Sequence, residues 1–164
     1  ALLFRNSDYA VEPLTSLTVH SFTPEQVFDL FSPTPQLAVG LSWLAAQAER
    51  QLDEQLVRIG RRRAKERLAH LFMELNYRLL RSGAPQPVAE LFPLTQPLLG
   101  DALGMSHVHT HRTFRELVRE NLISLHGGKV RLEDTKGISR LAGFDNSYLE
   151  QEALPSSTRM AFSR

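Results

Sequence analysis

Residues 94–123 read LTQPLLGDALGMSHVHTHRTFRELVRENLI, and they contain two helical patterns separated by a short turn. Thr95 is a good N-cap for the first pattern, and Pro97 lies in its first turn, where losing an N–H group costs little. Gly104 follows the last periodic residue, as a glycine in the left-handed conformation does after a helix. Ser106 then caps the second pattern. This arrangement is typical of a helix-turn-helix, which places its second helix in the DNA major groove.

The second pattern, at about 107–119, divides into two faces at helical spacing. One stripe is predicted to pack on the domain core: Thr110, Thr113, Phe114 and Leu117. Another is predicted to face outward: His107, Val108, His111, Arg112 and Arg115. An arginine can donate two hydrogen bonds to guanine O6 and N7, and a valine can touch a thymine methyl group. The second helix is therefore predicted to read base edges.

Two hydroxyl groups and the following loop complete the predicted DNA contacts. The hydroxyls of Thr95 and Ser106 suit phosphate oxygens, which fix the register without carrying sequence information. The predicted DNA-binding residues are Thr95, Ser106, His107, Val108, His109, His111, Arg112, Arg115 and Lys129.

Short apolar runs at 122–125 and 130–132 flank the sequence His126-Gly-Gly-Lys129. Two glycines between such runs are a hairpin signal. The apolar residues between 138 and 144 then predict a short closing helix. A hairpin after the second helix makes the unit a winged helix-turn-helix.

Residues 94–145 resemble the C-terminal DNA-binding domain of the Crp/Fnr family of bacterial transcription regulators. The resemblance is carried by L-T, then L-G-x-S-x-V-H-x-x-R-T, then L-I and L-A-x-F-D. It extends over roughly 1–145 and is much more specific in the DNA-binding half. It implies that Arg112 is the recognition-helix arginine used on guanine. His107 and Val108 match the two variable base-reading positions at the helix start.

Residues 34–59 form a long helical pattern without an internal proline after residue 35. Its apolar seam, at three- and four-residue steps, consists of Leu41, Leu44, Ala48, Leu52, Leu56 and Ile59. The resemblance implies that this is the family's long dimerisation helix, a two-stranded coiled-coil contact. The alternative is an amphipathic helix packed inside one subunit.

The resemblance implies a mainly α fold with a small β component, in four parts. We expect a remnant of a cyclic-nucleotide-binding-like β-roll over 1–32, with strands at 9–14 and 17–22 and a short helix from Thr23 to Phe31. The dimerisation helix spans 33–60, the winged helix-turn-helix domain spans 61–145, and 146–164 is a mobile tail. We also expect further residues of the sensor domain to precede residue 1.

The segment carries no predicted cofactor, and its effector is unknown. Cyclic-AMP-binding members have an adjacent Arg-Ser where this chain has Ser7-Asp8. A carboxylate there would repel the cyclic phosphate, which argues against cyclic AMP. The chain has no cysteine, so the segment cannot hold an iron–sulfur cluster through thiolates.

The basic run at 58–67, RIGRRRAKER, has two interpretations. It is either a nucleic-acid patch or the solvated face of the next helix, whose apolar residues begin at Leu68; we favour the solvated face. Gly60 is predicted to be a hinge between the two long helices.

The net charge of +1 is too small for bulk electrostatics to favour nucleic acid. No apolar run approaches the length of a membrane span, and no signal-peptide pattern is present. Together with the absence of cysteine, these features predict a cytoplasmic protein without a membrane partner. No nucleophile–base pair, phosphate-cradling glycine loop or carboxylate pair predicts an enzyme.

Two functions other than sequence-specific DNA binding are compatible with parts of the sequence. His107, His109 and His111 form an H-x-H-x-H run that could bind a metal, but on a helix His109 points away from the other two, so no metal site is predicted. The second alternative is a dimerisation or interaction module that no longer reads DNA specifically. We predict instead a homodimer that binds double-stranded DNA at an inverted repeat and contacts RNA polymerase.

Overall fold

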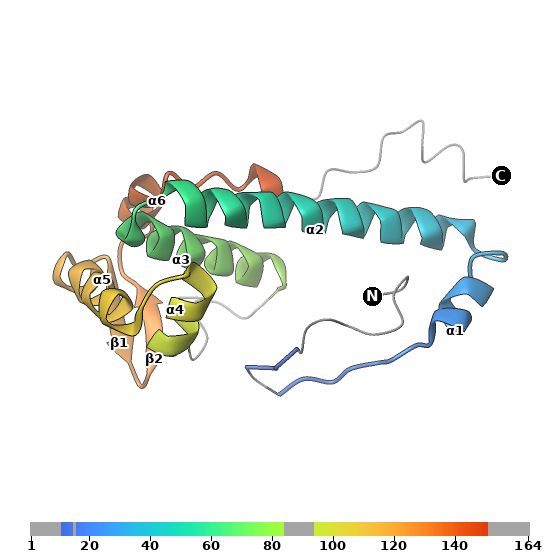
Figure 1. Ribbon diagram of the computed structural model, residues 1–164, viewed down its shortest axis with the longest axis horizontal. Helices are drawn as coiled ribbons and strands as arrows, with labels where there is room; N and C mark the ends of the chain where they lie inside the picture. The colour runs from blue at the N-terminus through green and yellow to red at the C-terminus, as the bar shows by residue number, and fades with distance from the viewer. Residues whose placement is uncertain (1–10, 15, 84–93, 151–164) are drawn as a thin grey trace. The chain divides into compact units, whose positions relative to one another are not determined.

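The structure of this chain is a computed structural model, and it describes residues 11–14, 16–83 and 94–150 (Figure 1). The helices are α1 (Pro24–Asp29), α2 (Pro35–Arg61), α3 (Ala64–Arg81), α4 (Gln96–Leu103), α5 (His107–Arg119) and α6 (Thr135–Ala142). The strands are β1 (Ile123–His126) and β2 (Lys129–Leu132), and a 3₁₀ helix, η1, spans Ser147–Leu149. This order confirms the predicted mainly α fold with a small hairpin.

The N-terminal strands that the sequence predicts are not formed in the described residues. Residues 11–14 and 16–22 have no strand and are exposed throughout. Two strands by themselves are marginally stable at best, because such a pair leaves its faces exposed. The short helix α1 is present, and Thr23 caps it by accepting a hydrogen bond from Gln26 N.

Helix α2 confirms the predicted long helix but not the predicted hinge. It runs through Gly60 to Arg61, and the chain leaves helical geometry at Arg63, which has φ −71° and ψ 157°. A single glycine costs a helix only about 1 kcal/mol, which its helix-forming neighbours offset. The new helix starts at Arg63, where Glu66 Oε2 accepts a hydrogen bond of 2.8 Å from the Arg63 N–H.

Residues Arg50–Glu150 form one compact unit, which therefore begins inside α2 rather than at residue 61. Helix α3 lies at its centre, with α5 and α6 packed against it (Figure 1). The buried apolar core is Leu68, Ala69, Phe72, Leu99, Leu103, Phe114, Leu117, Ile123, Val130, Leu132, Ile138 and Ala142. This core holds α4 and α5 in a fixed relation to α3.

The hairpin pairs β1 and β2 in antiparallel register, with Ile123 opposite Leu132 and His126 opposite Lys129. Gly127 and Gly128 form its turn with φ of +56° and +77°, a geometry that glycine adopts without strain. The hairpin predicted from the two glycines is confirmed.

The C-terminal side of the unit departs from the predicted mobile tail. Tyr148 and Leu149 of η1 are buried, and the backbone O of Ser147 accepts a hydrogen bond of 3.0 Å from Arg50. The prediction of mobility after Asp145 is therefore wrong for 146–150, where two large apolar groups pack on the domain. Residues 151–164 lie outside the described part of the chain. None of the helices in the described ranges has the length and apolar character needed to cross a membrane.

Candidate nucleic-acid interface

Helices α4 and α5 are joined by a three-residue turn whose ends are capped as the sequence predicts. Thr95 Oγ1 accepts from Leu98 N at 3.4 Å, and Ser106 Oγ accepts from His109 N at 3.3 Å. Gly104 ends α4 with φ +61°, the left-handed conformation expected of a C-terminal glycine. A capping hydroxyl keeps its own hydrogen, so Thr95 and Ser106 can still donate to an external acceptor.

Gly100 sets how closely the two helices approach. A Cβ atom on this residue would lie 2.9 Å from the Met105 carbonyl oxygen and 3.1 Å from Thr110 Oγ1. The first distance is shorter than real Cβ contacts and involves a backbone atom, and the second is tight, so a larger residue would force the two helices to shift.

The inner stripe of α5 is buried as predicted: Thr110, Thr113, Phe114 and Leu117. The Phe114 ring meets the Phe72 ring of α3 edge to face, with centroids 6.4 Å apart. Thr110 Oγ1 donates to the Ser106 backbone O at 3.0 Å, so its buried hydroxyl is satisfied. The inner stripe therefore fixes the rotation of α5 about its own axis.

That rotation leaves the predicted outer stripe in solvent: His107, Val108, His111, Arg112 and Arg115 are all exposed. Val108 is 78% exposed, so its methyl groups are accessible to an external partner. His109 differs from the others, because it is half-buried between the two faces.

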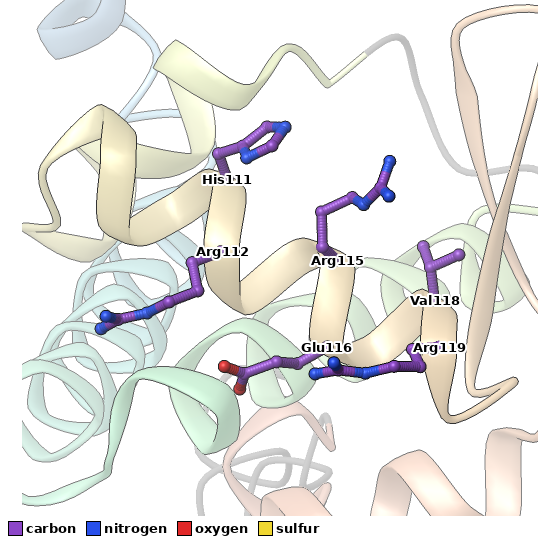
Figure 2. A pocket seen from close by; sticks show the side chains of 6 residues that line it. All are labelled: His111, Arg112, Arg115, Glu116, Val118 and Arg119. Atoms are coloured by element: carbon purple, nitrogen blue, oxygen red, sulfur yellow. The ribbon is translucent and has the colours of Figure 1, made fainter.

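Figure 2 shows the exposed side of α5. The side chains of His111 and Arg115 leave the helix on one side, and that of Arg112 leaves it on the other. They contribute to a hollow of about 560 Å³ whose lining residues all come from α5. A hollow lined by one helix is an open surface, unlike the concave enclosed sites that bind small ligands.

The charge of this surface suits a polyanion. In the described ranges, no ion pair involves Arg112 or Arg115, so both guanidinium groups keep their hydrogen-bond donors for an external partner. The first turn of α5 contains no acidic residue that would neutralise the positive end of the helix dipole.

The hairpin brings further basic side chains to the unit. Lys129 is exposed at the start of β2, beside the glycine turn. Arg131 Nε lies 3.7 Å from Glu133 Oε1, at the limit of an ion pair. The predicted wing residue is thus at the surface, where a phosphate could reach it.

The predicted dimerisation seam is largely solvent-exposed in a single chain. Leu44, Leu52 and Leu56 are 54%, 65% and 69% exposed, and Ile59 is 36% exposed. Ala48 is exposed and Leu41 is half-buried. Among the described residues, little covers this stripe.

Several arginines of the basic run 58–67 fit neither of the two interpretations, a nucleic-acid patch or a solvated helix face. Arg58 is 2% exposed and pairs with Glu74. Arg62 donates to the Ala142 backbone O at 3.3 Å, and Arg67 donates to the Leu103 backbone O at 3.4 Å. The preferred interpretation is wrong for these arginines, because the surrounding domain supplies acceptors that the local sequence does not reveal.

The domain contains a buried polar cluster that is not among the residues predicted from the sequence. The Tyr148 hydroxyl donates to Glu74 Oε2 at 2.9 Å, and His70 Nδ1 accepts from Arg58 Nε at 3.1 Å. A signal was available in α2, where polar Gln51, Glu54, Gln55 and Arg58 recur at three- and four-residue steps beside the apolar seam. Such spacing places them on one helical face.

The positions of the three histidines in α5 do not support the alternative metal site. His107 and His111 are exposed, whereas His109 is half-buried. Across the described ranges, no three His, Cys, Asp or Glu side chains come together in a way that could hold a metal ion. Ser7 and Asp8, which bear on cyclic AMP, lie outside the described residues.

Comparison with known proteins agrees with this geometry. Residues 66–141 match the family model of the Crp-like helix-turn-helix domain. The chain is 27% identical over 136 residues to the nitrogen fixation regulation protein FixK of Bradyrhizobium diazoefficiens, covering 82% of this chain and 56% of FixK. It is 27% identical over 135 residues to the transcriptional activatory protein AadR of Rhodopseudomonas palustris, with the same coverage of 82% and 56%. The chain thus spans little more than half the length of these relatives.

Solved structures show the same fold. FixK2 from Bradyrhizobium japonicum superposes with a TM-score of 0.65 at 20% identity, covering 73% of this chain and 59% of FixK2. The Crp/Fnr-family transcriptional regulator TTHA1359 from Thermus thermophilus superposes with a TM-score of 0.56 at 26% identity, covering 67% of this chain and 56% of TTHA1359. Residues 66–141 are therefore similar to Crp-like helix-turn-helix domains, and the chain is similar to transcription regulators of the Crp/Fnr family.

Proposed function

We propose that this chain is the DNA-binding part of a homodimeric transcription regulator that recognises an inverted repeat. The outer stripe of α5 is the observation that carries the proposal. Arg112 and Arg115 are exposed there without an ion pair among the described residues, and Val108 is exposed beside them. Guanidinium donors and an exposed valine are the groups that read guanine and thymine in the major groove.

Each predicted contact has a distinct part in this proposal. Arg112 pairs with guanine, while His107 and Val108 read the bases next to it. His109, His111 and Arg115 line the groove, and Lys129 contacts a phosphate from the wing. Thr95 and Ser106 hold the phosphate backbone at the starts of the two helices. The base contacts decide the sequence, and the phosphate contacts decide the register.

The apolar stripe of α2 supports the dimer. Leu52 and Leu56 are more than half exposed, and burying such a row against its copy is the usual coiled-coil solution. A two-fold dimer presents its recognition helices about one turn of DNA apart, roughly 34–36 Å. Its operator is therefore an inverted repeat. In this proposal the regulator acts in the cytoplasm and contacts RNA polymerase, and it is not an enzyme.

Selection of bound sequences from a random duplex pool tests the proposal. The chain is incubated with the pool at a fixed, stated salt concentration, and the bound fraction is sequenced after several rounds. Enrichment of an inverted repeat with half-sites one turn apart is the expected result. Salt-sensitive binding without any enriched sequence would contradict specific reading and favour an interaction module instead.

A further inference from the structure

The second half of α2 faces its own domain with polar side chains and turns its apolar ones away. Arg58 is the only buried residue of the whole helix. Leu52, Leu56 and Val57 are 65%, 69% and 42% exposed. Hydrogen bonds and charge pairs therefore hold this half of α2 to the compact unit, beside the partly covered side chain of Ile59, which is 36% exposed.

Four buried side chains form the centre of this attachment, which we call the polar joint: Arg58, His70, Glu74 and Tyr148. The Arg58 guanidinium donates through Nε to His70 Nδ1 at 3.1 Å and through Nη2 to Glu74 Oε2. The Tyr148 hydroxyl donates to the same carboxylate oxygen at 2.9 Å. The polar joint thus connects α2, α3 and η1 through one carboxylate.

Ring contacts and a second arginine complete the surroundings of Glu74 and His70. The Tyr148 and His70 rings stack with centroids 6.1 Å apart. Arg78 Nη2 lies 2.5 Å from Glu74 Oε1. On the other side of His70, Glu54 Oε1 lies 3.1 Å from Nε2. Arg58 is 2% exposed at the centre of these contacts, whereas the His70 Nε2 and Glu54 Oε1 atoms are buried without a hydrogen-bond partner.

A relay extends from the polar joint to the helix-turn-helix. Arg58 Nη1 donates to Gln55 Oε1 at 2.6 Å, and Gln55 Nε2 donates to the Ala102 backbone O at 2.8 Å. Ala102 lies in the last turn of α4, where carbonyl groups have no partner within the helix. Gln55 of the long helix α2 is thus hydrogen-bonded to the C-terminal turn of α4, the first helix of the helix-turn-helix.

Joints of this kind specify direction more than they add stability. The attraction within a buried ion pair roughly offsets the free energy that desolvation of the two charges costs. Apolar side chains of the same volume are therefore often at least as stabilising. Directed hydrogen bonds, however, are strong only near one distance and angle. Two surfaces joined by them are held in one relative orientation, while smooth apolar surfaces tolerate small rotations.

We propose that Arg58 and Glu74 are positioning residues that fix the direction of the long helix relative to the helix-turn-helix, and so determine which half-site spacing the dimer accepts. This inference rests on the proposed function, because spacing has meaning only for a dimer on two half-sites. Moving one half-site by one base pair shifts it by about 3.4 Å and rotates it around the DNA axis. A rigid joint cannot follow that movement, and a loosened joint can.

The first test measures the joint without DNA. The chain has no cysteine, so Asp53→Cys on α2 and Lys136→Cys on α6 introduce two unique and exposed spin-label sites. Doubly labelled chain is diluted with excess unlabelled chain, so that each distance is measured within one copy. The variant is Arg58→Met with Glu74→Gln, which removes both charges and leaves no unpaired buried charge.

A narrow distance distribution is expected with the intact joint, and one broader by about twofold in the double variant. An unchanged distribution in the double variant would overturn the proposal. The matched control is Lys65→Met with Glu120→Gln, which removes an exposed ion pair of the same charges from the same unit. This control is expected to keep the narrow distribution.

The second test uses DNA. Dissociation constants are measured on one selected half-site and on inverted repeats whose half-site spacing is changed one base pair at a time. With the intact joint, one spacing is expected to bind about tenfold more tightly than its neighbours. The double variant is expected to bind the single half-site as before and to lose that preference. Retention of the spacing preference would overturn the proposal.

If the chain does not recognise DNA specifically, the unaltered chain shows no preferred half-site in the second test. The spin-label test does not use DNA, so it still measures whether the polar joint fixes the helix. Should the double variant not fold, Tyr148→Phe removes one donor to Glu74 without changing a charge. It is expected to broaden the distance distribution to an intermediate width, and an unbroadened distribution would count against the joint.

Discussion

The carbonyl oxygen of Met105 lies 2.9 Å from the position that a Cβ atom would take on Gly100. The oxygen belongs to the turn between the two helices, and the glycine lies in the first of them. This contact sets the closest approach of α4 to the start of α5. It therefore decides where the exposed side chains of α5 are presented.

Gly100→Ala is expected to lower the free energy of unfolding by about 1–3 kcal/mol, because the added carbon overlaps backbone atoms that cannot move separately. Gly60→Ala is the matched control. Gly60 lies within α2 with no atom within 4 Å of an added Cβ, so alanine should raise stability by about 0.5–1 kcal/mol. Urea unfolding measures both changes. Equal effects of the two substitutions would refute the close approach.

Arg112→Ala is expected to weaken binding to the selected operator by about 1–3 kcal/mol and to relax the preference at one base pair of each half-site. The physical reason is the loss of two hydrogen bonds to one guanine. Titrations on the operator and on single-base variants measure the change. Arg140→Ala, on the exposed side of α6, is the control that removes the same charge elsewhere. Uniform weakening by Arg112→Ala on all sequences would mean that this residue contacts only phosphate.

Leu52→Asp is expected to abolish the dimer at micromolar concentrations, because burying an unpaired carboxylate in an apolar seam is costly. Leu52 is 65% exposed in one chain, so the folded monomer should tolerate the change. Leu80→Asp introduces the same charge at an exposed leucine of α3 and should leave the dimer intact. Sedimentation equilibrium distinguishes the two states. A dimeric Leu52→Asp variant would show that the association uses another surface.

His70 predicts a pH dependence of stability. Burial lowers the pKa of His70 to about 3, and the positive charges of Arg58 and Arg62 act in the same direction. The carboxylate of Glu54 lies on the other side of the His70 ring. An unfolded histidine has a pKa of about 6.5, so below that pH the unfolded chain takes up a proton that the folded chain refuses. Stability should therefore fall as the pH drops below about 6.5, with a slope of up to about 1.4 kcal/mol per pH unit.

Urea unfolding between about pH 5 and pH 7 measures this slope. Carboxylates also contribute to it, so the test is a difference between variants. His70→Gln should remove the histidine part, whereas His126→Gln, at an exposed position of β1, should leave the slope unchanged. A His70→Gln slope equal to that of the unaltered chain would contradict the buried neutral histidine.

The helix-turn-helix could be predicted from sequence because its signals are local. Thr95, Gly104 and Ser106 act within one turn of the residues they cap, and the structure places all three as expected. The faces of α5 follow from helical spacing alone. The same holds for the glycine turn of the hairpin.

The polar face of α2 can be recognised from its spacing, but the pairings of the polar joint could not be predicted because the partners are distant in the chain. Tyr148 and Glu74 are 74 positions apart, and each looks like an ordinary surface residue in its own segment. Arg58 belongs to a run of arginines that reads as solvated, and only the fold brings a carboxylate to it. The absence of strands in residues 11–14 and 16–22 has a related cause, since strand pairing depends on partners that a local pattern does not specify.

The buried contacts of α2 also decide how the DNA-binding domain can be excised. A fragment that starts at residue 62 would lack the hydrogen bond from Gln55 to the end of α4. It would also lack Arg58, the buried ion-pair partner of Glu74. A fragment that stops at Asp145 would remove the Tyr148 hydroxyl from the same carboxylate. A fragment over Arg50–Glu150 keeps all of these contacts, and it cuts the long helix in its middle rather than at its end.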